Sequence, residues 1–112
     1  MKQAVEKPIE FVGSSRDDLR EFPASSLRRS GYQLGKVQRG DDPDDCKPMP
    51  DVGQGVKEIR VACKDGAFRV FYVVDRPEAI YVLHAFRKTS QRTEKRDLNL
   101  AKSRFRSLGS VP

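Results

Sequence analysis

The sequence predicts a single small domain of the α/β (α+β) class, with elements in the order β-α-α-β-β-β-α. The chain has 112 residues, which is the size of one domain. Residues 56–86 alternate between apolar and polar side chains, as antiparallel strands do, and turn signals divide them. Apolar residues near the C-terminus recur at spacings of three and four, which is typical of a helix. We expect the domain to span residues 1–112, with its core over about residues 8–108.

The first third of the chain predicts one strand and two helices. Residues 8–12 form a short apolar run, and residues 13–15 supply a turn and a helix N-cap. The helix that follows must stop or bend near Pro23. Ser25 or Ser26 can cap a second helix, which runs to about residue 39. Its inward-facing residues are Leu27, Leu34 and Val37.

Residues 40–54 read GDDPDDCKPMPDVGQ, a segment rich in Asp, Pro and Gly. The segment has no apolar periodicity of either helix or strand. This composition predicts a loop or an exposed lid.

The next segment predicts a three-strand antiparallel meander. VKEIRVACKDGAFRVFYVV turns at Asp65-Gly66, and IYVLHAF follows across DRPEA. A two-residue turn there, or a four-residue turn over residues 64–67, sets residue 61 opposite 70 and residue 60 opposite 71.

This pairing predicts two faces of different character. The apolar face, expected to pack on the N-terminal helices, carries Ile59, Val61, Cys63, Phe68, Val70 and Tyr72. The other face carries Glu58, Arg60, Ala62, Arg69, Phe71 and Val73. Two guanidiniums from neighbouring strands, Arg60 and an exposed Arg69, thus project to one side beside an aromatic ring, which indicates an anion site.

The C-terminal segment predicts a last helix. Thr93 can cap it and Gly109 is a natural stop. Its apolar residues are Leu98, Ala101, Phe105 and Leu108. Its outer side would display Lys95, Lys102 and Arg106, so that a basic ridge flanks the sheet edge.

The charge is unevenly distributed, and the excess lies in the second half. The formal net charge is +6. Residues 1–55 hold nine basic and ten acidic residues, a net −1, and residues 56–112 hold thirteen and six, a net +7. This concentration favours a polyanion as partner, and the alternative is a solvated helix face that serves solubility.

Other classes of protein are disfavoured by what the sequence lacks. No apolar run approaches the roughly 20 residues that cross a bilayer, and the start lacks a signal peptide, so we expect a cytoplasmic protein with no membrane partner. Cys46 and Cys63 are expected to be free thiols. With one histidine and no Cys/His ligand spacing, we expect no metal and no cofactor.

The sequence resembles the phage-derived Gp49-like proteins, also described as HigB-type toxins of the RelE/ParE superfamily. The resemblance runs from about Pro8 to Leu108, through IEFVGSSRDDLREFP, GYQL, VQRG, KPMPDVGQGVKEIRV, GAFRVFYVV, IYVLHAFRKTSQRT and DLNLAKSRF. It implies a RelE-like domain that is the toxin of a type II toxin–antitoxin pair. It also implies endoribonuclease activity on mRNA in the ribosomal A site, and a helix-turn-helix antitoxin of the HigA type as partner.

The resemblance also implies which residues are catalytic, and the basic C-terminal half supplies the candidates for binding RNA. Arg60 matches a basic residue of the family's central strand, Arg69 the arginine after the glycine turn, and Arg87-Lys88 the basic pair after the last strand. The expected RNA-binding residues are Arg92, Lys95, Arg96, Lys102 and Arg106.

Each of these residues also has a structural interpretation. Arg69 could pair with Glu58 or cover apolar surface, and Arg87 and Lys88 could keep a strand edge soluble. Tyr72 lies on the predicted core face and is expected to pack there.

His84, the remaining catalytic candidate, is the only group that titrates near neutral pH. Its face depends on the length of the turn through residues 75–79. A turn with an even number of residues places His84 beside Arg69. A turn with an odd number of residues buries it and moves Arg87 onto the arginine face.

Two departures from the family leave the general acid unassigned. Thr89 follows Arg87-Lys88 where relatives often carry another lysine, and Phe105 stands where a tyrosine could act as an acid. ParE-type members keep the fold and target gyrase instead. The alternatives to a ribonuclease are therefore a non-nucleolytic inhibitor of that type or a basic binding module.

Overall fold

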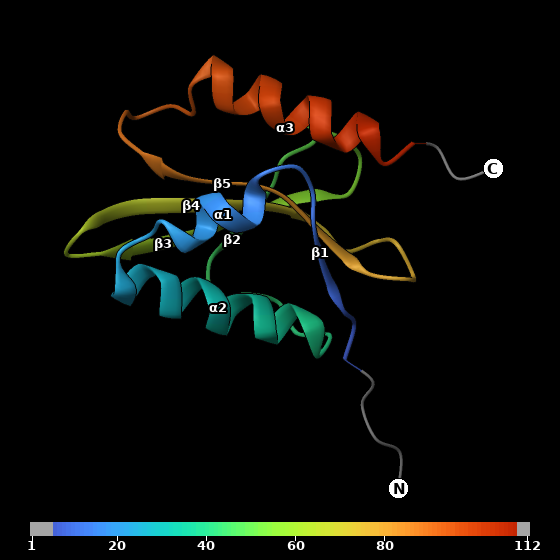
Figure 1. Cartoon of the computed structure of the whole chain (residues 1–112), viewed down its shortest axis with the longest axis horizontal. Coiled ribbons are helices and arrows are strands. Elements are labelled where there is room, and N and C mark those ends of the chain that lie inside the picture. Colours follow the sequence, from blue (N-terminus) through green and yellow to red (C-terminus); the bar gives the residue numbers. More distant parts are fainter. Residues whose placement is uncertain (1–5, 110–112) are drawn as a thin grey trace, which may run out of the picture.

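The computed structural model describes residues 6–109 as a mixed five-stranded sheet between two layers of helix (Figure 1). The elements in chain order are β1 (Ile9–Phe11), α1 (Ser15–Arg20), α2 (Ala24–Gln38), β2 (Cys46–Pro48), β3 (Val56–Cys63), β4 (Gly66–Val73), β5 (Ile80–Lys88) and α3 (Lys95–Ser107). The strand order across the sheet is β1-β5-β4-β3-β2. Strands β2 to β5 pair antiparallel, and β1 joins β5 in parallel. The predicted fold class and the antiparallel meander are confirmed.

The segment predicted as a loop contains one further short strand, β2. It pairs with the start of β3, with Cys46 opposite Ile59 and Pro48 opposite Lys57. Three residues that include a proline carry no readable alternation, which explains why the sequence did not predict the strand. The proline is tolerated because β2 lies at the edge of the sheet.

The β3–β4 hairpin keeps the predicted faces, but its register differs from the predicted one. Arg60 lies opposite Arg69 and Val61 opposite Phe68, and the turn is formed by residues 64–65 rather than 65–66. When a two-residue turn moves by one position, each residue pairs with a partner two positions from the predicted one. Every side chain therefore stays on its face. Gly66, with φ of +130°, lies directly after the turn.

The first face of the sheet packs on α1 and α2, as predicted. Its apolar residues are buried apart from Cys63, which is partly buried. The ring of Phe22, which follows α1, lies 4.7 Å from that of Phe68. Helix α2 begins at Ala24 directly after Pro23, so neither Ser25 nor Ser26 caps it, and Ser26 donates instead to the Pro23 carbonyl.

The second face of the sheet is partly covered by α3, which lies over it rather than along the sheet edge (Figure 1). The helix begins after Glu94, one residue later than the predicted cap at Thr93. Ala101 is fully buried against the sheet, as are Phe71 and Val73 beneath the helix. The predicted inward positions of α3 are confirmed, since Leu98, Phe105 and Leu108 also pack against this cluster.

Cys46 and Cys63 are free thiols, as predicted. Within residues 6–109, no helix has the length and apolar character needed to cross a membrane.

The carboxylate of Asp44 joins the chain after α2 to the helix. It accepts hydrogen bonds from Lys36 Nζ at 2.7 Å and from Gln33 Nε2 at 2.8 Å. These hydrogen bonds, Lys36 first, hold the pKa of Asp44 below its ordinary value of 3.8. A lowered pKa contributes stability above the ordinary value, and this contribution is lost as the pH falls through the folded value.

We therefore expect Asp44 to titrate below pH 3.8 in an NMR pH series. Lys36→Met should move its midpoint upward, because the first of the two donors is lost. An unchanged midpoint in Lys36→Met would show that this ion pair does not form in solution.

Candidate functional site

Three charged residues, which we call the arginine cluster, meet on the second face of the sheet: Arg60, Arg69 and Glu58. The register sets the two arginines directly opposite each other on β3 and β4. Glu58 Oε1 lies 3.8 Å from Arg60 Nε, and Glu58 Oε2 lies 3.8 Å from Arg69 Nε. One buried carboxylate therefore holds two guanidiniums side by side. The predicted pairing of the two arginines on one face is observed.

Arg69 is buried, so the expectation of an exposed side chain is wrong. Only 9% of it is exposed, and its Nη1 donates to the carbonyl of Phe68 at 3.0 Å. Arg69 Nε and Glu58 Oε2 both have no hydrogen-bond partner among the described residues. Arg69 therefore pairs with Glu58, which is one of the two structural alternatives. The two charged groups form an ion pair, but Arg69 Nε and Glu58 Oε2 do not form a hydrogen bond.

Arg60 is the accessible member of the cluster. Its side chain is 38% exposed, and Nη1 also lies 3.9 Å from the carboxylate of Asp45. Both of its ion pairs are long, and only the one with Asp45 lies near solvent, because Glu58 is buried. An incoming phosphate can compete for it.

Two lysines on the flanking strands lie on the same face. Lys47 of β2 pairs with Glu58, and Lys88 of β5 pairs with Ala67, two residues from Arg69. Directly paired residues share a face, so four adjacent strands each contribute a basic side chain here. Ala62 is exposed at this hairpin end of the sheet, which α3 does not cover.

Arg87 does not join the arginine cluster. It pairs with Phe68 on the first face, its Nη2 donates to the carbonyl of Asp65 at 2.7 Å, and its guanidinium lies 5.8 Å from the centre of the Phe68 ring. The strand alternation that places Lys88 beside Arg69 necessarily points Arg87 the other way.

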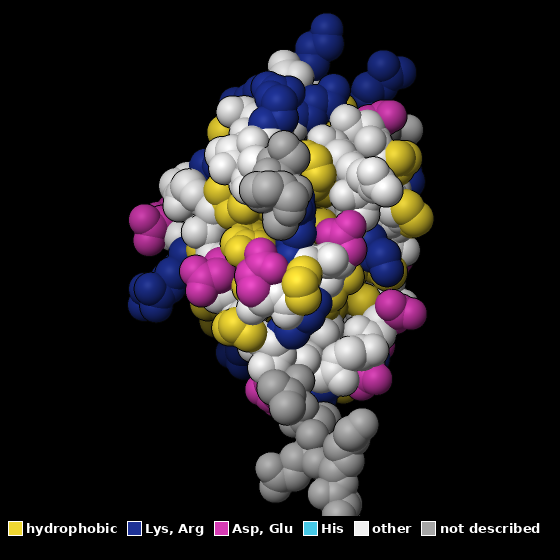
Figure 2. Space-filling model, turned by 90° about the vertical axis from the view of Figure 1, so that its right-hand side faces the viewer, with side chains coloured by type: hydrophobic (Ala, Val, Ile, Leu, Met, Phe, Trp, Pro, Cys, Tyr) yellow, Lys and Arg dark blue, Asp and Glu magenta, His cyan; other side chains and the backbone are white. Residues whose placement is uncertain are grey.

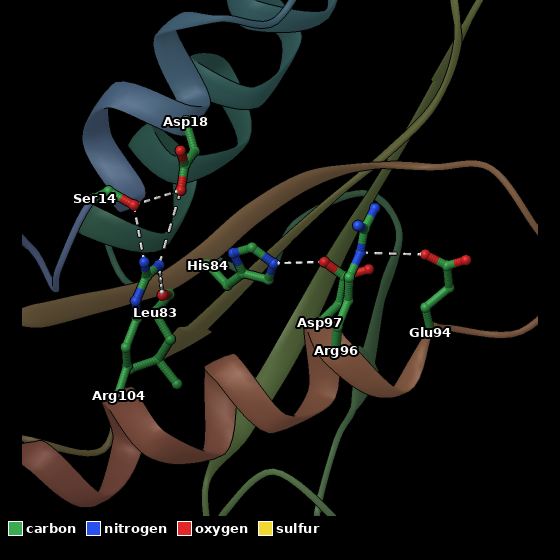
Figure 3. A network of polar contacts seen from close by, with 8 residues as sticks. All are labelled: Ser14, Asp18, Leu83, His84, Glu94, Arg96, Asp97 and Arg104. Atoms are coloured by element: carbon green, nitrogen blue, oxygen red, sulfur yellow. Dashed lines mark hydrogen bonds and ion pairs between the residues drawn. The ribbon is translucent and has the colours of Figure 1, made fainter.

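The turn between the paired residues Val73 and Tyr81 is odd, yet His84 lies on the second face opposite Phe71, where the even-turn alternative placed it, and it is buried, as the odd-turn alternative predicted. A bulge at Leu83 shifts the register between β4 and β5 by one residue, which moves His84 to the other face of the sheet. Its ring stacks on Phe86 at 4.9 Å, and Nε2 lies 2.8 Å from Asp97 Oδ1 of α3 (Figure 3). Nδ1 has no hydrogen-bond partner among the described residues.

The expected RNA-binding residues lie in the loop before α3 and on the helix itself. Arg92, Lys95, Arg96 and Arg106 are exposed and Lys102 is half-buried. Arg96 Nε lies 3.4 Å from Glu94, so part of this charge is internally paired. Figure 2 shows Lys and Arg side chains gathered at the α3 end of the molecule, with acidic side chains below them.

Arg104 belongs to the same basic run but ties α3 to the rest of the domain. Its Nη1 donates to the carbonyl of Leu83 and its Nη2 to Ser14 Oγ, both at 2.9 Å (Figure 3). Asp18 of α1 lies 3.9 Å from the guanidinium. The charge of the C-terminal half is thus not all available to a partner.

The sequence placed Glu58 on the arginine face and gave its pairing with Arg69 as an alternative, but it did not indicate the contact with Arg60. Two contributors to the site, Lys47 and Asp97, were missed. Lys47 required knowledge of β2, and Asp97 required the placement of α3 over the sheet. Among residues 6–109, no group of three His, Cys, Asp or Glu side chains converges to hold a metal ion.

The mixed sheet with α1 and α2 on one face and α3 on the other is a small α+β domain, with basic side chains at the open end of its second face. The chain belongs to the phage-derived Gp49-like protein family, whose sequence model matches residues 17–106. The predicted resemblance is thereby confirmed.

A solved structure is similar to this chain in fold. A chain in the crystal structure of the toxin–antitoxin complex RelBE2 from Mycobacterium tuberculosis shares the fold, with a TM-score of 0.52 and 18% identity. The match covers 80% of this chain and all of that one. No curated protein matches the sequence.

Proposed function

We propose that the chain is the toxin of a type II toxin–antitoxin pair and acts in the cytoplasm as a ribosome-dependent endoribonuclease on mRNA. The observation that carries this proposal is the arginine cluster, in which Glu58 holds Arg60 and Arg69 opposite each other. Membership of the Gp49-like family and the fold shared with a chain of a toxin–antitoxin complex support it. A helix-turn-helix antitoxin of the HigA type is the proposed partner that neutralises the toxin.

The chemistry of RNA cleavage matches what these residues can supply. Attack of a 2′-hydroxyl on the adjacent phosphate requires in-line positioning and stabilisation of charge on the phosphoryl oxygens. Arg60 is accessible and would bind the phosphate, while the buried Arg69 presents a fixed positive charge behind it. Lys47 and Lys88 flank the cluster and would bind the neighbouring phosphates.

The remaining basic residues would dock the protein on ribosomal RNA. Those of α3 and the preceding loop extend the charge beyond the arginine cluster, and Arg87 supplies positive charge from the other face. Contacts with phosphates of this kind give affinity and a steep salt dependence.

His84 is the proposed general base, with Asp97 as its positioning residue. The contact with Asp97 Oδ1 fixes the ring orientation, and the buried Nδ1, which has no partner among the described residues, would accept the proton once substrate binding uncovers it. We expect His84→Ala to reduce the cleavage rate by about 100-fold, since general base catalysis contributes at least that factor. Asp97→Asn should lower the rate less and shift its pH profile. An unchanged rate in His84→Ala would remove the histidine from the mechanism.

Primer extension on an abundant translated transcript, after induced expression in cells, tests the activity itself. We expect cuts in phase with the reading frame, and their loss when a translation inhibitor empties the A site. Cuts that persist without translation would indicate a ribosome-independent nuclease.

A non-nucleolytic inhibitor is the second candidate. Its supporting observation is the burial of Arg69 and the partial neutralisation of both arginines by Glu58. A protein of the ParE type or a basic binding module would arrest growth while leaving every transcript intact.

A further inference from the structure

The outer edge of β5 is only partly occupied. β1 has three residues and pairs with residues 80–82 alone, after which the chain leaves the sheet for α1. Ser15 Oγ donates to the carbonyl of Val82, and Arg104 donates to that of Leu83. Beyond Leu83, no described residue outside β4 hydrogen-bonds to the backbone of β5.

The unoccupied edge presents backbone groups at regular intervals. The amide of Ile80 donates toward β1 and the carbonyl of Val82 accepts from it, so these residues point outward. Alternation along an antiparallel strand, corrected for the bulge at Leu83, makes Ala85 and Arg87 the next outward residues. Their N–H and C=O groups therefore form a ready template for another strand.

A groove of about 630 Å³ runs along this edge, between α1 and α3. Phe22 and Phe68 line it on the side of the first face, and Phe86 and Leu100 on the side of the second face. The bridge from Arg104 to Ser14 and Asp18 crosses from α3 to α1 beside it, as Figure 3 shows. Leu100 is one of two large hydrophobic residues exposed in residues 6–109, the other being Tyr32 on α2.

We propose that this edge groove binds an extended peptide segment of a partner protein, which adds to the sheet as a strand beside β5. An added strand directs alternate side chains to opposite faces, and the groove offers apolar walls on both. Glu21, which directly follows α1 and has no ion pair among the described residues, favours a basic residue toward that wall.

The same geometry favours a single segment over a second copy of this chain. The edge is flanked by α1 on one side and α3 on the other. A second β5 would carry its own α1 and α3 into that space, whereas an isolated extended peptide brings only its side chains. Arg60 and Arg69 do not line the groove, but His84, the proposed general base, does, so peptide binding is measured directly and not through RNA cleavage.

Selection from a phage-displayed library of random peptides of about ten residues, on the full chain, tests the proposal. The selected peptides should carry apolar residues on both faces of an extended backbone. In hydrogen exchange, the amides of Ala85 and Arg87 should become protected when the synthetic peptide is bound.

Matched variants distinguish binding in this groove from nonspecific hydrophobic binding elsewhere on the surface. Leu100→Asp should weaken peptide binding by at least about tenfold, and Tyr32→Asp, which changes the other exposed large hydrophobic, should not. The proposal is overturned if no peptide is enriched, if both variants bind equally well, or if the two amides stay unprotected.

Discussion

Arg69→Ala is expected to abolish the in-frame cuts and the growth arrest that follow induction of the wild-type protein. Loss of one fixed charge donor at a reacting phosphate lowers the rate by about 100- to 1000-fold. That reduction would take primer-extension products below detection.

The variant must be compared with two others, because Arg69 also contacts the buried Glu58. Arg60→Ala removes the accessible guanidinium, whose ion pairs are long, and leaves Glu58 beside Arg69, so it should reduce cleavage while melting close to wild type. Arg16→Ala changes an exposed arginine of α1 and should leave cleavage and melting unchanged. Cutting by Arg60→Ala and Arg69→Ala at the wild-type rate would remove the arginine cluster from the chemistry.

The sequence predicted the faces of the meander well because side-chain alternation does not depend on the turn position. The six residues of the predicted apolar face, from Ile59 to Tyr72, all lie on the first face, although the turn is displaced by one residue. A displaced turn changes partners by an even number, which leaves the faces intact. The pairing of Arg60 with Arg69 rather than with Phe71 is the consequence that the pattern could not predict.

The face of His84 illustrates the opposite case. Val73 pairs with Tyr81 near the turn, and continuing that register would set His84 opposite Val70 on the first face. The bulge at Leu83 moves it opposite Phe71 instead. A bulge is set by local packing on both faces of the strand, and no turn length encodes it.

The position of α3 was also beyond the sequence, although its inward residues were not. The spacing of Leu98, Ala101 and Phe105 defines an apolar stripe but does not say which surface the stripe covers. The helix is located by the burial of Phe71 and Val73. In the sequence these two residues belong to a face that also carries charged side chains, so their burial could not be predicted. The placement of Asp97 beside His84 follows from it.

Glu58→Ala is expected to destabilise the fold strongly, because it leaves the buried Arg69 without its counter-ion. Removing one partner of a buried ion pair costs roughly 3–5 kcal/mol, a large fraction of the stability of a small domain. Chemical denaturation of the purified protein measures this loss.

The double variant Glu58→Leu/Arg69→Met supplies the control. If the pair costs desolvation without compensating hydrogen bonds, as the unsatisfied Glu58 Oε2 and Arg69 Nε indicate, two apolar residues should restore most of the stability. Such a protein would fold and still fail to cut RNA, which places the buried pair in function rather than in folding. A double variant as unstable as Glu58→Ala would instead show that the ion pair is required by the fold.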